Sequence, residues 1–134
     1  MREILFRGKR VDNGKWVYGV PIKKALVGSH DGYYPKIIPE CDGRHQTVYS
    51  IVIKEETIGQ YTGLRDKNGT RIFEADIVKV YDVYCNETVV GVVEFCDGSF
   101  RIYDKNFTSY DRWMYYEVEV IGNVYDNQEL LKGE

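Results

Sequence analysis

The chain has 134 residues, a length typical of one compact domain, and 43% of them are hydrophobic and 29% charged. This composition excludes an intrinsically disordered, a collagen-like and a coiled-coil protein. The formal net charge of -3 indicates no overall attraction to nucleic acid or to an anionic membrane. Twelve tyrosines and thirteen glycines against three prolines are typical of short strands joined by glycine turns.

The first elements in chain order are two predicted strands, 2–11 and 15–22. They flank Asp12-Asn13-Gly14, and an Asn-Gly pair between strand-forming residues is a strong signal for a β-hairpin. Gly19 and Pro21 interrupt the second strand. We therefore expect this strand to lie at a sheet edge or to carry a bulge.

The middle of the chain is less regular. Residues 23–46 have no sustained periodicity and are expected to form a loop, shortened by a strand at 33–38. The segment 47–54 is dense in β-branched residues and predicts another strand, and 57–61 predicts one more.

The C-terminal half predicts an antiparallel meander with strands at 77–84, 89–95 and 100–104. Apolar and acidic residues alternate over 115–121, which indicates a half-buried strand, and Asp126 or Asn127 is placed to cap a short terminal helix. The prediction is a mainly β chain, with an N-terminal β-hairpin and loop region (1–56) and a small antiparallel barrel (57–134). Closing the barrel removes exposed sheet edges.

Three segments have a recognisable order and spacing. They are MREILFR at 1–7 with WVYG at 16–19, IGQYTGLRDKNGTRIFEADIV at 58–78, and EVIGNVY at 119–125 with Asn127, Glu129, Leu130 and Leu131 after it. Together they resemble the YopX family of small proteins from bacteriophages and prophages. The resemblance covers nearly the full length, and the second segment is its most specific part.

The resemblance implies a mostly β protein whose C-terminal part is an SH3-like barrel, encoded by a phage or prophage and acting in a bacterial cytoplasm. It implies no activity and transfers no catalytic residue. Its motif residues are expected to have structural roles, and they are Gly63, Asp66, Gly69, Glu74, Asp76, Gly122 and Asn123.

Two positions depart from the family pattern. Ala75 stands where the family usually has Gly in a Glu-Gly-Asp turn, and Gln128 stands where it usually has Pro. A positive φ at Ala75 would strain the backbone by roughly 1 kcal/mol, so we expect a negative φ there.

Charge is unevenly distributed along the chain. Residues 1–36 carry eight basic groups against three acidic ones, so the rest of the chain is acidic. The basic candidates for binding are Lys9, Arg10, Lys23 and Lys24. A second candidate surface is the aromatic and basic side of the meander, with Tyr81, Arg101 and Tyr103.

Residues able to carry catalysis or bind metal are scattered. Cys41 and His45 have the spacing of half a zinc site, but neither Cys85 nor Cys96 provides the second pair. The sequence therefore predicts no metal, no cofactor and no catalytic residue. The odd cysteine count and an N-terminal apolar run of three residues predict a soluble cytoplasmic protein without a membrane segment.

These observations favour a non-enzymatic protein-interaction module with a protein partner and a tendency to form homo-oligomers. The alternative is a nucleic-acid-associated regulator that uses the basic N-terminal region and the aromatic barrel face. A small enzyme is the third interpretation, with Asp76, Glu74 and His45 as its candidates.

Overall fold

A computed structural model describes residues 3–22, 35–40, 50–82, 86–104, 109–110 and 117–132. The chain divides into two compact units, Met1–Gln60 and Tyr61–Glu134. The described residues form antiparallel strands and short 3-10 turns and contain no α-helix, which confirms the mainly β prediction. Each unit is described by itself below.

The first unit begins with the predicted hairpin. Strands β1 (Phe6–Lys9) and β2 (Trp16–Ile22) pair antiparallel, with Lys9 opposite Trp16 and Phe6 opposite Gly19. The connecting loop is closed by the Arg10 N–H, which donates to the Lys15 carbonyl at 2.9 Å. Gly14 has a φ of +70°, a conformation that glycine adopts without strain, so the Asn-Gly pair ends the loop as the sequence predicts.

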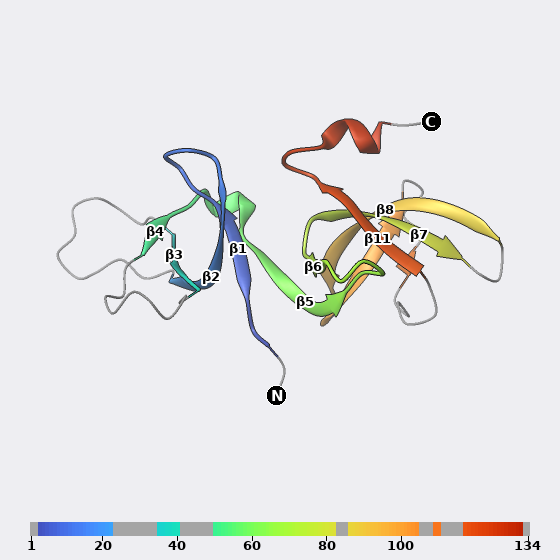
Figure 1. Cartoon of the computed structure of the whole chain (residues 1–134), viewed down its shortest axis with the longest axis horizontal. Helices are drawn as coiled ribbons and strands as arrows, with labels where there is room; N and C mark the ends of the chain where they lie inside the picture. The colour runs from blue at the N-terminus through green and yellow to red at the C-terminus, as the bar shows by residue number, and fades with distance from the viewer. Residues whose placement is uncertain are drawn as a thin grey trace. The chain divides into compact units, whose positions relative to one another are not determined.

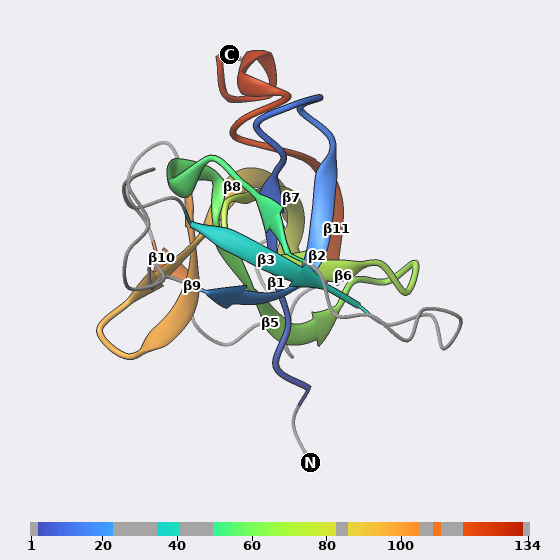
Figure 2. The ribbon, with the colours of Figure 1, turned by 90° about the vertical axis from the view of Figure 1, so that its left-hand side faces the viewer.

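Strand β3 (Lys36–Pro39) lies beside β2, and β4 (Ile51–Val52) lies beside β3 (Figures 1 and 2). A bridge between Arg10 and Ile53 brings the chain after β4 back to β1. The four strands therefore enclose a small apolar cluster. Its members are Val17, Ile37 and Ile53, with Ile51 and Ile58 packed against them.

The expectation that β2 is an edge strand is wrong, because β2 pairs with β1 on one side and with β3 on the other. A Cβ on Gly19 would lie 1.8 Å from the Ile38 carbonyl oxygen, so glycine lets β3 approach this closely. Pro21 is tolerated for a different reason. The Tyr18 carbonyl points toward β3, where it accepts from the Glu40 N–H. By strand alternation the Pro21 nitrogen points to the opposite side, where β1 does not extend as far as Pro21.

After a 3-10 turn, η1 (Glu55–Thr57), strand β5 (Gly59–Arg65) begins beside β1 in the first unit and continues into the second. There it pairs with β6 (Arg71–Phe73). The remaining strands form a sheet in the order β10-β9-β8-β7-β11. They are β7 (Asp76–Asp82), β8 (Glu87–Cys96), β9 (Ser99–Asp104), β10 (Ser109–Tyr110) and β11 (Glu117–Asn123).

Strands β7, β8 and β9 form the predicted meander, and β11 follows the alternation of residues 115–121 within its described part. Strand β10 is an addition that the sequence did not indicate. The inner face of this sheet buries an apolar cluster made of Ile72, Val78, Val80, Val93, Ile102 and Val118. The SH3-like barrel implied by the resemblance stays a prediction for this unit.

The chain ends in a 3-10 turn, η3 (Gln128–Leu131), and its predicted side-chain cap is absent. Asn127 stands at the cap position, but its side-chain oxygen accepts from the Asn123 N–H at 3.1 Å instead. A Cβ on Gly122 would lie 2.6 Å from that oxygen, so this glycine leaves room for the Asn127 side chain.

The expected negative φ at Ala75 is wrong, because Ala75 has a φ of +74° in the turn between β6 and β7. Hydrogen bonds on both sides fix this conformation. The Ala75 N–H donates to the Val93 carbonyl at 2.7 Å, and the Ala75 carbonyl accepts from the Val124 N–H at 3.0 Å. The Asp76 carboxylate also accepts from the Phe73 N–H at 2.7 Å. Together these bonds outweigh a left-handed strain of about 1 kcal/mol.

Replacing Ala75 by glycine tests this strain. We expect Ala75→Gly to raise the free energy of unfolding by about 0.5 kcal/mol, because relief of left-handed strain exceeds the added freedom of the unfolded chain. Ala75→Val should lower it by more than 1 kcal/mol, roughly, because a β-branched residue tolerates this conformation least. Urea unfolding of the two variants measures both changes, and a less stable glycine variant would contradict the account.

Candidate binding surfaces

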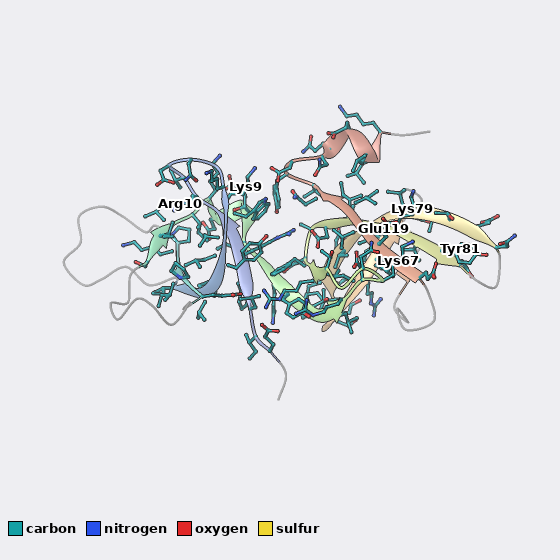
Figure 3. All side chains as sticks on the ribbon, in the orientation of Figure 1. Lys9, Arg10, Lys67, Lys79, Tyr81 and Glu119 are labelled. Carbon is teal, nitrogen blue, oxygen red and sulfur yellow. The ribbon has the colours of Figure 1, made fainter. Side chains whose placement is uncertain are left out.

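The structure places the sequence-predicted binding residues in both units. Lys9 and Arg10 lie at the hairpin of the first unit, and Tyr81 lies on β7 of the second (Figure 3). Arg101 and Tyr103 are on β9. The predictions for Lys23, Lys24, Cys41, His45 and Cys85 fall outside the described residues.

Among the motif residues, Asp66 makes the most extensive contacts. Its carboxylate is buried and accepts three backbone N–H groups, from Asn68, Thr70 and Val120, each at 2.9 Å. Burial would raise the pKa of Asp66, but these three donors, with Lys67 nearby, hold the pKa below its usual value. The charged carboxylate thus fastens the β5–β6 turn to β11.

The same turn makes a second contact with β11, because the Lys67 N–H donates to the Val118 carbonyl at 3.0 Å. Lys67 also forms an ion pair with Glu119 at 3.6 Å (Figure 3). Gly63 within β5 has a φ of +88°, and Gly69 in the turn between β5 and β6 has a φ of +82°. An L side chain would be strained at either position.

Asn123 organises the turn after β11. Its side-chain oxygen accepts from the N–H groups of Tyr125 and Asp126 at 3.0 Å, and its amide donates to the Asp126 carboxylate at 3.1 Å. Asp76 is likewise buried and bound to the backbone, while Glu74 is half-buried in the Ala75 turn. These polar groups hold turns of the second unit in place.

Lys9 and Arg10 are neighbours on the chain and therefore point to opposite sides of the strand. The Arg10 guanidinium binds Asp12 through two hydrogen bonds of 2.9 and 2.7 Å, and the side-chain hydrogen bond lowers the pKa of Asp12. Arg10 is thus compensated locally. Lys9 lies opposite Trp16, with its ammonium 5.6 Å from the centre of the indole ring.

Lys9 belongs to an outer surface that the sequence interpretation missed. Strand β2 buries Val17 and Gly19 inward, and its alternate residues Tyr18, Val20 and Ile22 are 37%, 57% and 37% exposed. Strand pairing places further residues on the same side. We call this surface the apolar-basic face, and it comprises Arg7, Lys9, Trp16, Tyr18, Val20, Ile22, Lys36, Ile38, Glu40 and Val52.

The charges of the apolar-basic face are mostly positive. The Arg7 guanidinium lies over the Trp16 ring, 4.4 Å from its centre, and Lys9 approaches the same ring. Lys36 lies opposite Ile22, so each end of the apolar row on β2 carries a lysine. A protein surface with apolar and acidic groups would complement this combination.

One signal in the sequence points to this face. The run WVYGVPI in β2 is apolar at both alternating sets of positions, which is typical of a strand covered on both sides. In an all-β unit the interior covers only one set. The other set is then left at the surface, where it is available to a partner.

In the second unit, register brings Tyr81, Arg101 and Tyr103 to one outer side of the sheet. Tyr81 pairs with Thr88 on β8, and four residues further along β8, on the same side, Val92 pairs with Tyr103. We call this surface the tyrosine face. It also carries Lys79 and Glu119, which are labelled in Figure 3, and by strand register Glu94 and Glu117.

Polar contacts tie the side chains of β9 together on this face. A hydrogen bond with the Cys96 thiol raises the pKa of Tyr103, and a hydrogen bond with Arg101 acts in the opposite direction. Arg101 lies directly opposite Glu94, and its Nε donates to the Ser99 hydroxyl at 3.2 Å. The tyrosine face thus combines aromatic rings with charges of both signs.

Among the described residues, no group of three or more His, Cys, Asp or Glu side chains lies close enough together to hold a metal ion. Within those same ranges, no helix is long and apolar enough to cross a membrane.

The fold and its outer faces define a mainly β protein of two small antiparallel units. The family model described as YopX protein matches residues 5–132. The chain therefore belongs to the YopX family.

Two solved structures are similar over nearly the whole chain. Protein EF1440 from Enterococcus faecalis has 24% sequence identity and a TM-score of 0.56, covering 98% of this chain and 99% of its own. Protein yopX from Bacillus subtilis has 21% identity and a TM-score of 0.58, with the same two coverages. These similarities concern the fold. None of the curated proteins compared with the sequence matches it.

The contacts of Asp66 predict a pH-dependent contribution to stability. Since its folded pKa lies below the unfolded value of about 3.9, the contribution is fully present above the unfolded pKa and is lost as pH falls through the folded pKa. We expect Asp66→Asn to lower the free energy of unfolding by about 2 kcal/mol at pH 7, because an amide nitrogen replaces one acceptor oxygen.

The deficit of Asp66→Asn should begin to shrink below about pH 4, where the carboxyl is protonated in the unfolded chain, and should shrink further as pH falls through the lower folded pKa. Urea unfolding at pH 7 and pH 3 measures it. The exposed substitution Glu129→Gln serves as the control and should change stability by less than about 0.5 kcal/mol. A deficit that is equal at both pH values would contradict the role assigned to the charged form.

Proposed function

We propose that this chain is a non-enzymatic protein-interaction module, an accessory protein of a phage or prophage that acts in the bacterial cytoplasm. The bacterial sources of the two similar structures support this setting. The observation that carries the proposal is the exposed row of Tyr18, Val20 and Ile22 on β2. Such a row, lying beside Trp16 and lysines, is typical of a protein contact.

The row has the properties of an interaction surface rather than of scattered exposure. Its residues follow one another at alternate positions of a single strand, and neighbouring strands add Ile38 and Val52 to the same side. Trp16, which is half-buried, is a residue type that contributes strongly to binding energy when a partner covers it. The stacking of Arg7 on Trp16 holds both side chains in place before binding, which reduces the entropy lost on association.

A nucleic-acid-associated regulator is the second candidate. One observation favours it, namely that Arg7 and Lys9 both approach the Trp16 ring, since aromatic rings beside cations bind single-stranded nucleic acid by stacking. The net charge of -3 opposes strong binding to phosphate. We therefore place this function second.

A capture experiment tests the proposed function. The tagged protein and its variant Val20→Thr/Ile22→Thr are incubated with bacterial lysate, with and without nuclease, and bound material is analysed by mass spectrometry. Threonine keeps the strand propensity and removes apolar contact. We expect a stoichiometric protein that survives nuclease and is captured about tenfold less by the variant.

The matched control is Ile4→Thr/Leu64→Thr, which removes two exposed apolar side chains outside the apolar-basic face. It should capture the partner as the wild type does. Equal loss in both variants would refute the assignment to this face. Recovery of nucleic acid, with proteins released by nuclease and binding that weakens steeply with salt, would favour the second candidate instead.

A further inference from the structure

We infer that the apolar-basic face binds the tyrosine face of a second copy of this chain, in a head-to-tail contact. The inference rests on the proposed function, because it names a partner for the same surface. Three properties of the two faces support it: the placement of charge at both ends of the apolar row, the opposite net charges of the two units, and the matching separation of their charged side chains.

The charge placement disfavours a symmetric contact between two apolar-basic faces. Lys9 stands beside Trp16 at one end of the apolar row, and Lys36 stands beside Ile22 at the other. A two-fold axis through this face therefore brings lysine against lysine in either orientation of the strands. Like charges placed together in an interface oppose association, so a different surface must provide the complement.

The second unit is the acidic part of the chain. Residues 1–60 contain ten basic against seven acidic residues, a net charge of +3, whereas residues 61–134 contain eight against fourteen, a net charge of -6. Two copies therefore attract each other when the first unit of one approaches the second unit of the other. This attraction raises the rate of encounter and favours the head-to-tail orientation.

The charged side chains of the two faces have the same spacing. Lys9 on β1 and Lys36 on β3 are two strands apart and six residues apart along β2, from Trp16 to Ile22. On the tyrosine face, Glu117 on β11 and Glu94 on β8 are also two strands apart. Glu117 is in register with Thr88 of β8 through Tyr81, and Thr88 lies six residues from Glu94 along β8. Both separations are about 22 Å.

Both acidic side chains are exposed, and the two lysines are half-exposed. Each lysine can therefore face one glutamate across the contact, while the apolar row on β2 meets the side of the sheet that carries Tyr81 and Tyr103. Tyrosine combines an apolar ring with a hydroxyl and is common where two protein surfaces meet.

A complementation experiment separates a head-to-tail contact from a symmetric one. One variant, Lys9→Glu/Lys36→Glu, reverses the charge of the apolar-basic face, and a second, Glu94→Lys/Glu117→Lys, reverses that of the tyrosine face. Sedimentation velocity measures the association of each variant alone, of the wild type and of an equimolar mixture. Circular dichroism and thermal unfolding confirm that both variants are folded.

We expect the wild type to self-associate, with a dissociation constant that rises about tenfold between low and high salt. Each variant alone should associate at least about tenfold more weakly than the wild type. The mixture should regain association close to that of the wild type, because the two intact faces pair with each other and the two reversed faces, one now carrying glutamates and the other lysines, are complementary as well. Only a contact between two different surfaces gives this result.

The matched controls reverse the same number of charges elsewhere, as Lys15→Glu/Lys132→Glu and Glu55→Lys/Glu129→Lys, and should associate like the wild type. A monomeric wild type at about 100 μM overturns the inference, since an assembly contact is expected to form there. So does a mixture that forms no dimer, or a tyrosine-face variant that associates like the wild type.

The same proteins separate failure of this inference from failure of the proposed function. If the wild type is monomeric but still captures a foreign protein through Val20 and Ile22, the second copy is excluded and the interaction module stands. If the capture is also unaffected by Val20→Thr/Ile22→Thr, the proposed role of the apolar-basic face fails with it.

Discussion

An antiparallel sheet without helices to cover it buries one face, and the surfaces of the described part of this protein, which contains no α-helix, follow from that constraint. In the first unit the strands close around Val17, Ile37 and Ile53, so among the described residues no second layer covers the alternate residues of β2. In the second unit the inner side of the sheet packs around Val78, Val80 and neighbouring residues, and Tyr81 and Tyr103 are left on the outside. Both proposed contacts use these uncovered sides.

Local sequence signals predicted well which segments form strands, and less well which strands pair with one another. The Asn-Gly hairpin and the β7–β8–β9 meander depend on turns and alternation within short segments, which a sequence displays directly. The position of β2 inside its sheet depends on Gly19 admitting the Ile38 carbonyl, a contact with a distant segment. Ala75 is similar, because Val93 and Val124 hold its backbone in a conformation that alanine disfavours on its own.

The candidate surfaces were predictable to the extent that strand periodicity fixes them. Tyr81, Arg101 and Tyr103 share a side because the meander register follows from its short turns. Which side of WVYGVPI is buried could not be read from its composition, since both alternating sets are apolar. Net charge along the chain indicated a basic N-terminal region, but Arg10 is compensated by Asp12, the buried Arg7 stacks on Trp16, and Lys36 lies beside the exposed apolar row.

The attachment of the β5–β6 turn to β11 also bears on aggregation. Strand β11 is the last in its sheet, so the backbone groups on its outer edge are open to pairing with a strand from another molecule. Asp66 and Lys67 occupy two of these groups, the Val120 N–H and the Val118 carbonyl. A strand from a second chain cannot extend the sheet there without displacing a buried carboxylate. The attachment of this turn thereby disfavours edge-to-edge stacking of copies through β11.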